Sequence, residues 1–198
     1  MTRTLLTGGL VFDGTGAPPA AADVLIEGGR IVEVGPGLDG DEAVDVAGRH
    51  LLPGLFDCHT HVTLTSINLL GIVQTPFSYR FYETVQNLRA TPAAGITMVR
   101  DAAGVRVAMG TDSGVTPHGR NLAELELMAK GGMTPAQVLA ATTSSAAELL
   151  GVADELGTLE PGKWADVVVV DGDPFELATV GERIAAVVQD GRLVSGHV

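Results

Sequence analysis

Two histidines separated by one residue follow an apolar segment that reads PGLFDCHTHV. In a β-strand, residues two apart face the same side, so His59 and His61 can direct both imidazoles toward one point. Two neutral imidazoles on a rigid strand are typical ligands of a divalent metal ion. The spacing therefore predicts a metal site; the alternative is a pair of surface or structural histidines.

An acidic turn follows a second apolar run, VRVAMGTDSG. A carboxylate at that point, Asp112, could ligate a metal and accept a proton from a water molecule. An Asx turn or a helix cap would explain the same residue without any chemistry. His118 lies in the loop that follows and is a candidate for substrate binding, with a solvated loop histidine as the alternative.

The charge of the chain excludes two classes of partner. Twelve basic and 24 acidic residues give a net charge of −12, which repels both a phosphate backbone and an anionic membrane. The N-terminus lacks the apolar core of about 7 to 15 residues that is typical of a signal peptide. We therefore expect a cytoplasmic protein with no nucleic acid and no membrane as partner. Its single cysteine, Cys58, excludes an internal disulfide.

Short β-type runs separated by turn signals fill both ends of the chain. Apolar runs flank Glu27–Arg30 and again Asp190–Gly191, as in two hairpins. We predict that residues 1–50 and 157–198 together form one small β-sandwich domain. The chain would leave this domain near His50 and return to it near Gly157.

Between the two ends, strand and helix patterns alternate, which favours a parallel α/β layer over residues 51–156. Pro92 should break the last turn of its helix or end that helix earlier. Thr134 and Gly151 should cap the two ends of another helix. Helices are predicted over three segments, 79–94, 121–130 and 135–150.

Four segments, taken in order, resemble the amidohydrolase superfamily: PGLFDCHTHV, AGITMVRDAAG, VAMGTDSGVTPHGRNLAELELMAKGGMTPAQVLAATTSSAAELLG and LGTLEPGKWADVVVVDGDP. The resemblance is strongest to its branch of imidazolonepropionase-like and Xaa-Pro or Xaa-Arg dipeptidase-like enzymes. It implies a metal-dependent hydrolase that cleaves a C–N bond of a small amide or dipeptide. It also implies a (β/α)₈ barrel with a small β-sandwich built from both termini.

The resemblance implies roles for particular residues as well. His59 and His61 match the metal ligands at the end of barrel strand one. Asp112 matches the strand-eight aspartate, which binds the metal, takes a proton from the attacking water and passes a proton to the leaving nitrogen. Arg100 and Asp101 fall at the end of strand two, where we expect a supporting role. The implied cofactor is a divalent metal, with zinc as the expected ion.

Part of the family pattern is absent from this sequence. Such enzymes also supply a carbamylated lysine, or an equivalent acid, and one histidine from each of two further strands. Only His118 is left for these places, because His50 and His197 fall in the terminal sheet region. A second metal site and a lysine carbamate are therefore not expected.

Length limits the barrel in the same way. A complete barrel takes about 250 residues, more than residues 51–156 provide. The predicted fold is α/β, with a partial (β/α)₈ barrel that keeps strands one, two and eight and their helices, and with a deletion seam near residues 104–105. Its exposed strand edges would favour a homo-oligomer.

The seam raises a problem of geometry. The turn DAAG is too short for the crossover of roughly a dozen residues that joins parallel strands. An antiparallel turn there would carry Asp112 to the opposite end from His59 and His61, unless one segment stays out of the sheet. The chain is therefore either an active hydrolase or a catalytically inactive, internally truncated remnant or subunit.

Overall fold

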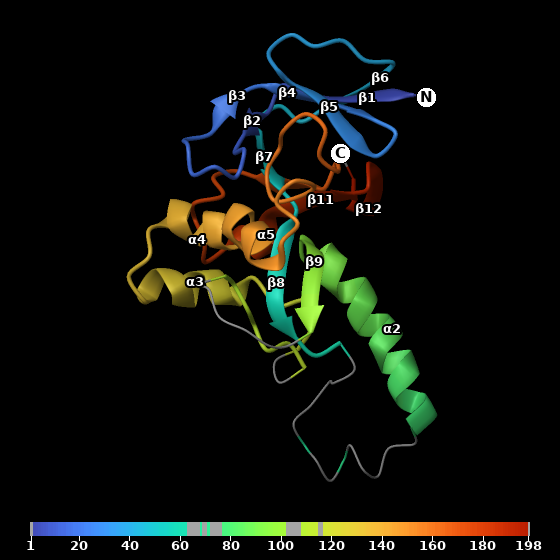
Figure 1. The fold of residues 1–198 in the computed structure, drawn as a ribbon, viewed down its shortest axis with the longest axis vertical. Coiled ribbons are helices and arrows are strands. Elements are labelled where there is room, and N and C mark those ends of the chain that lie inside the picture. The colour runs from blue at the N-terminus through green and yellow to red at the C-terminus, as the bar shows by residue number, and fades with distance from the viewer. Residues whose placement is uncertain are drawn as a thin grey trace.

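The computed structural model describes residues 2–62, 68, 71, 77–101, 108–114 and 117–197. The proposed seam at residues 104–105 lies outside this part of the chain. Figure 1 shows sheets built from both ends of the sequence above a smaller α/β layer, with β8 and β9 pointing away from those sheets. The fold is α/β with mixed sheets.

Ten strands from the two ends of the chain form two sheets. The four-stranded sheet has the order β5-β4-β1-β6, and its strands are β1 (Arg3–Thr7), β4 (Asp23–Glu27), β5 (Arg30–Gly35) and β6 (Glu42–Asp45). The six-stranded sheet has the order β12-β11-β10-β7-β2-β3. Its strands are β2 (Leu10–Val11), β3 (Ala20–Ala21), β7 (Arg49–Pro53), β10 (Val167–Asp171), β11 (Ile184–Gln189) and β12 (Arg192–Gly196).

Two hairpins form where the sequence predicts them. Gly28 and Gly29 have φ angles of 59° and 81° and join the antiparallel strands β4 and β5. Asp190 and Gly191, at 51° and 68°, join β11 and β12. Two consecutive residues with positive φ make the turn whose twist matches the flanking strands.

Strand β10 is apolar on both faces because each face packs against a different core. Val167 and Val169 lie in the core shared with the four-stranded sheet, together with residues such as Ile26. Val168 and Val170 lie in a second core with side chains from the α/β layer. The continuous run VVVV therefore reflects a strand covered on both sides.

The α/β layer is built around two parallel strands, β8 (Leu55–Thr60) and β9 (Ile96–Asp101). Helix α2 (Phe77–Ala93) precedes β9 and contacts it. On the other side lie α3 (Ala123–Lys130), α4 (Pro135–Ala141) and α5 (Ser144–Leu150). A short 3₁₀ helix, η1 (Val180–Arg183), leads into β11.

The single helix expected over residues 135–150 is wrong, because α4 and α5 are separate. The hydroxyls of Thr142 and Thr143 both donate to the carbonyl of Leu139, at 2.8 and 2.7 Å. Such bonds compete with the helical backbone ladder. The start of α4 is as predicted, since Thr134 and Gln137 form a reciprocal capping box, and Gly151 ends α5 in the left-handed conformation.

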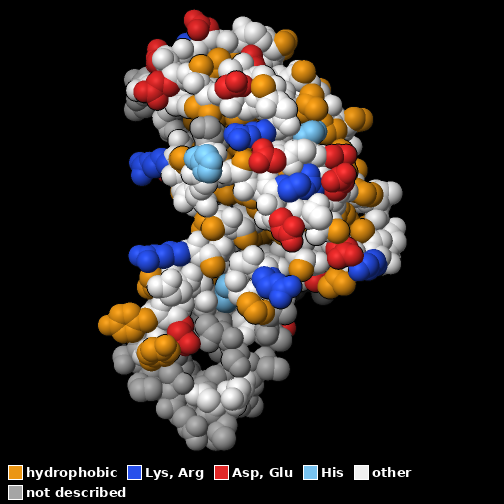
Figure 2. Space-filling model, turned by 180° about the vertical axis from the view of Figure 1, so that it is seen from behind, with side chains coloured by type: hydrophobic (Ala, Val, Ile, Leu, Met, Phe, Trp, Pro, Cys, Tyr) orange, Lys and Arg blue, Asp and Glu red, His pale blue; other side chains and the backbone are white. Residues whose placement is uncertain are grey.

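Helix α2 runs to Ala93, so Pro92 lies within its last turn. Along this helix, hydrophobic side chains recur every third residue on the exposed side; they are Tyr79, Tyr82, Val85 and Leu88. Figure 2 shows hydrophobic side chains gathered at the lower left, over α2. No helix among the described residues is long and apolar enough to cross a membrane.

The backbone of residues 109–113 runs along the edge of β8 that β9 leaves open. The amide of Cys58 donates to Met109, that of Asp112 donates to His59, and that of His61 donates to Ser113. The bridge between Thr60 and Ser113 is parallel. Of the two alternatives that the short turn DAAG left open, the antiparallel turn that carries Asp112 to the opposite end is therefore wrong. The segment forms no regular strand, but it follows β8 in the same direction.

Candidate metal centre

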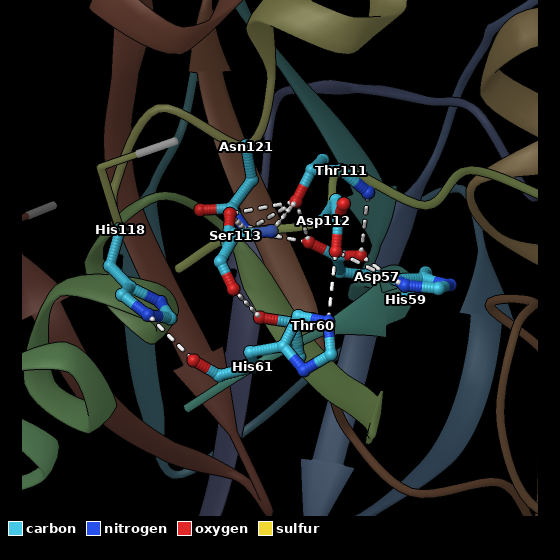
Figure 3. A network of polar contacts seen from close by, with 9 residues as sticks. All are labelled: Asp57, His59, Thr60, His61, Thr111, Asp112, Ser113, His118 and Asn121. Carbon is cyan, nitrogen blue, oxygen red and sulfur yellow. Dashed lines mark hydrogen bonds and ion pairs between the residues drawn. The ribbon is translucent and has the colours of Figure 1, made fainter. Parts of the chain in front are cut away.

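His59, Asp112 and His61 converge at the end of β8 (Figure 3). Oδ1 of Asp112 lies 3.2 Å from Nε2 of His59 and 2.9 Å from Nε2 of His61. One ligand atom from each of the three residues lies within 4.8 Å of the others. The imidazole rings are nearly perpendicular, at 79°, with centroids 5.5 Å apart. Strand alternation has thus placed both imidazoles on one side of β8.

These distances fit a metal ion, such as Zn²⁺, that binds both nitrogen and oxygen ligands. Two ligands of a tetrahedral zinc, each about 2.0–2.2 Å from the ion, lie roughly 3.3 Å apart. Both measured contacts to Asp112 are close to that separation. The same contacts are also possible between a carboxylate and imidazole N–H donors. The three side chains are partly exposed, at 46%, 30% and 52% for His59, His61 and Asp112, so the group is open to a ligand.

Asp112 reaches the histidines through an unusual backbone conformation. Its φ is +53°, in the left-handed region, where Asp is one of the few non-glycine residues found routinely. The residues beside it are held on β8, because the amide of Thr111 donates to the His59 carbonyl and that of His61 donates to the Ser113 carbonyl. Ser113 is fully buried. The turn therefore fixes the direction of an otherwise exposed carboxylate.

A buried polar network lies directly behind the three candidate ligands. Asp57 is fully buried and accepts hydrogen bonds from the side chains of Thr111 and Asn121. It also accepts from the amides of His59 and Thr111, both at 3.1 Å. Neither Asp57 nor Asn121 was identified from the sequence. The signal for Asp57 was its position two residues before His59, on the same face of the predicted strand.

The charge of this network affects the pKa of an acidic side chain on α3. Burial, and then the charge of Asp57, raise the pKa of the Glu124 carboxyl. Glu124 lies with Thr111, Asn121 and Leu127 in the wall of a cavity of about 260 Å³. This cavity adjoins the polar network through Thr111 and Asn121, and none of the three candidate ligands lines it.

The remaining residues of interest lie at different distances from the centre. Nε2 of His118 lies 3.2 Å from the carbonyl of His61 and donates to it, so this ring contacts the backbone of a candidate ligand. Asp101 aligns with Thr60 at the end of β9, and Arg100 precedes it there. Cys58 is buried and not part of a disulfide.

Comparisons with known proteins point to one family. The model of the Amidohydrolase family matches residues 101–194, which contain Asp112 and His118 but not the two strand histidines. A 5-methylthioadenosine/S-adenosylhomocysteine deaminase of Teredinibacter turnerae is 30% identical over 162 residues, 76% of this chain and 36% of the relative. An imidazolonepropionase of Shouchella clausii is 36% identical over 117 residues, 54% of this chain and 25% of the relative.

Solved structures share the fold at low sequence identity. A Xaa-Pro dipeptidase with methionine bound in its active site superposes with a TM-score of 0.83 at 16% identity, over 97% of this chain and 99% of that chain. The ochratoxinase of A. niger superposes with a TM-score of 0.82 at 14% identity, over 99% of this chain and 96% of that chain.

The sequence matches cover part of the relatives, and the superpositions show a shared fold. The chain spans 36% and 25% of the length of the two curated relatives, so it corresponds to part of each. Its β8 motif and its acidic turn meet at one point, as the resemblance of the four sequence segments implies. The chain is similar to the amidohydrolase family over residues 101–194, and the first of the two relatives is similar to it over 76% of this chain.

Proposed function

We propose that this chain is a metal-dependent hydrolase that cleaves a C–N bond in a small amide or dipeptide. The observation that carries the proposal is the meeting of His59, His61 and Asp112 within 4.8 Å of one another. Two imidazoles and one carboxylate offer three ligands, which is the usual number in a catalytic zinc site and leaves a position for water. Zinc is the proposed ion.

The residues of the centre would have different roles in hydrolysis. A bound divalent ion supplies a Lewis acid and lowers the pKa of its water toward neutrality. Asp112 turns Oδ1 toward both imidazoles, and its Oδ2 has no partner within the described residues. That second oxygen can take a proton from the attacking water and return one to the leaving nitrogen. We place His118 near the substrate, where its ring contacts the His61 backbone.

The same centre suggests how the chain relates to a barrel. We infer that β9, β8 and residues 109–113 correspond to strands two, one and eight of a (β/α)₈ barrel. Supporting this, both neighbours of β8 run parallel to it, and functional residues of such barrels lie at the carboxyl ends of the strands. We propose residues 51–156 as the barrel-derived domain and 1–50 with 157–198 as the sandwich domain. Association through open strand edges stays a prediction for size-exclusion chromatography.

Two other functions compete with dipeptide or amide hydrolysis. An inactive, truncated remnant is not favoured, because the three candidate ligands have stayed together. Deamination is a second candidate, since a deaminase is among the matched relatives. The substrate panel should therefore include Xaa-Pro dipeptides, small amides and 5-methylthioadenosine.

Metal analysis of the purified full chain tests the proposal. We expect about one zinc per chain, lost in His59→Ala and retained in His197→Ala, whose histidine is exposed near the C-terminus. Hydrolysis of one member of the panel should follow the metal content of these variants. A wild-type chain that binds no divalent ion, or one whose metal content His59→Ala leaves unchanged, would contradict the proposal.

A further inference from the structure

Asp57 is a fully buried acidic side chain that the proposed mechanism does not use. Both of its oxygens act as acceptors. Oδ1 receives the amides of His59 and Thr111, and Oδ2 receives the Thr111 hydroxyl and Nδ2 of Asn121, at 2.5 and 2.6 Å. Four donors converge on one carboxylate. In this arrangement Asp57 acts only as an acceptor.

The hydrogen bonds around Asp57 close into a ring (Figure 3). Because the Thr111 hydroxyl gives its proton to Asp57, the 2.7 Å contact between Thr111 and Ser113 must be donated by Ser113. Asn121 then gives one amide hydrogen to Asp57 and the other to Ser113, 3.0 Å away. Its own oxygen accepts from the amide of Gly119. Each hydroxyl proton in the ring is used once.

The members of this ring flank Asp112 on both sides. Thr111 and Ser113 precede and follow it in the chain, and the hydrogen bonds of Asp57 and Asn121 go to these two residues and to one another rather than to the Asp112 carboxylate. What the ring holds is the backbone of a turn with a left-handed residue at its centre. Aspartate tolerates that conformation, and the bonds made by Thr111 and Ser113 hold this turn in it.

We propose that Asp57 and Asn121 form a positioning pair that holds the Thr111–Ser113 turn against β8, and so holds the Asp112 carboxylate over His59 and His61. This inference rests on the proposed metal centre and adds to it two residues that touch no ligand. The pair acts through Thr111, whose amide and hydroxyl both bond to Asp57.

The direction in which the hydrogen bonds of the ring are donated offers a specific test. In Asp57→Asn the new NH2 group faces either the amides of His59 and Thr111, so that two bonds are lost, or Nδ2 of Asn121, so that two donors meet and that bond is lost even if the Thr111 hydroxyl rotates to accept. Adding Asn121→Asp reverses the donors. The amide introduced at position 57 can donate to the carboxylate introduced at position 121 and to Thr111, and both hydroxyls can rotate to donate the other way. The double variant therefore restores the ring, while each single variant breaks it.

The experiment uses Co²⁺ as the probe and the full chain as the protein. Titration gives the affinity, and the visible absorption of bound Co²⁺ reports its coordination geometry. We expect Asp57→Asn to bind Co²⁺ about 10–100-fold more weakly, the usual effect of losing an outer partner of a ligand, with an altered spectrum. The double variant should recover most of the affinity and the wild-type spectrum. Thr111→Val, which removes one hydroxyl and keeps the β-branched shape, should weaken binding severalfold and serves if Asp57→Asn fails to fold.

A matched control separates positioning from general stability. Thr134→Ala removes the cap of α4, away from the ring, and should lower the thermal midpoint without changing Co²⁺ affinity or spectrum. If Asp57→Asn and Thr111→Val both bind Co²⁺ as tightly as the wild type does, the positioning role is overturned, while the proposed metal centre is not. A double variant no better than Asp57→Asn would overturn the assigned ring. A wild-type chain that binds no Co²⁺ would overturn the metal centre and this inference with it.

Discussion

Gly110 is the position where one added methyl group should most disturb the proposed metal centre. A Cβ at Gly110 would lie 2.7 Å from Cβ of His59 and 3.3 Å from its backbone nitrogen. Carbon atoms in ordinary contact are at least about 3.5 Å apart. In Gly110→Ala, the new Cβ and Cβ of His59 must therefore move apart by roughly 0.8 Å. The contacted atoms are backbone or Cβ, and no rotamer change can relieve the clash. Residues 109–113 must therefore move away from β8.

That movement has two measurable consequences. Overpacking of this kind costs about 1–3 kcal/mol of unfolding free energy, which urea denaturation followed by circular dichroism would measure. The same shift opens the contacts of Asp112 with His59 and His61, now 3.2 and 2.9 Å. We expect Co²⁺ affinity to fall by at least about tenfold, as when other supports of metal ligands are lost.

Gly35→Ala is the matched control for this substitution. A Cβ at Gly35 would meet no atom within 4 Å, and its φ lies outside the left-handed region. Its replacement should leave Co²⁺ binding unchanged and leave stability unchanged or higher by about 0.4–1 kcal/mol. If Gly110→Ala matches Gly35→Ala in both measurements, then residues 109–113 do not lie as close to β8 as described.

Three further substitutions test other parts of the structure. Thr134→Ala, which removes the capping box of α4, should lower the unfolding free energy by about 1 kcal/mol in urea. Arg30→Lys removes a guanidinium that lies 3.7 Å from the centroid of Trp164; because this is the only tryptophan, its fluorescence should shift, with a stability loss of about 0.5–1 kcal/mol. Burial raises the pKa of the Asp166 carboxyl, so folding loses stability as pH rises above the ordinary value of 3.8. Asp166→Asn should therefore be more stable than wild type at pH 7, and the difference should vanish below that ordinary pKa; equal stability at all pH values would contradict the burial argument.

Local signals in the sequence were sufficient for the elements that depend on local geometry. The pairs Gly28–Gly29 and Asp190–Gly191 adopt positive φ at both residues, which few sequences do at low cost. Thr134 caps α4 as expected, because its side chain and that of Gln137 satisfy backbone donors within one turn. The alternation of β8 was also readable. It brings His59 and His61 to one point because the strand period is two.

Signals that depend on distant parts of the chain were missed. The break between α4 and α5 looked like ordinary helix, yet it lets the carbonyls of Ala141 and Thr142 accept the amides of Met109 and Phe56. Helix propensity cannot anticipate such tertiary partners. Only the antiparallel alternative for the turn before Asp112 was wrong, since the length of that turn said nothing of the hydrogen bonds that β8 offers on its open edge.

The support of the proposed metal centre depends on how β8 leaves the six-stranded sheet. β7 pairs with the fully buried part of β10, and a single glycine, Gly54, separates β7 from β8. A Cβ there would lie 2.0 Å from Oγ1 of Thr97 and 2.9 Å from Cβ of Asp166, so the chain passes from sheet to α/β layer in close contact with both. The start of β8 is therefore as firmly held as the core. Its end is held by β9 and by residues 109–113, and the latter depend on Asp57. A ligand that joins His59, His61 and Asp112 would add a further connection between β8 and residues 109–113, beside their backbone hydrogen bonds and the Asp57 network.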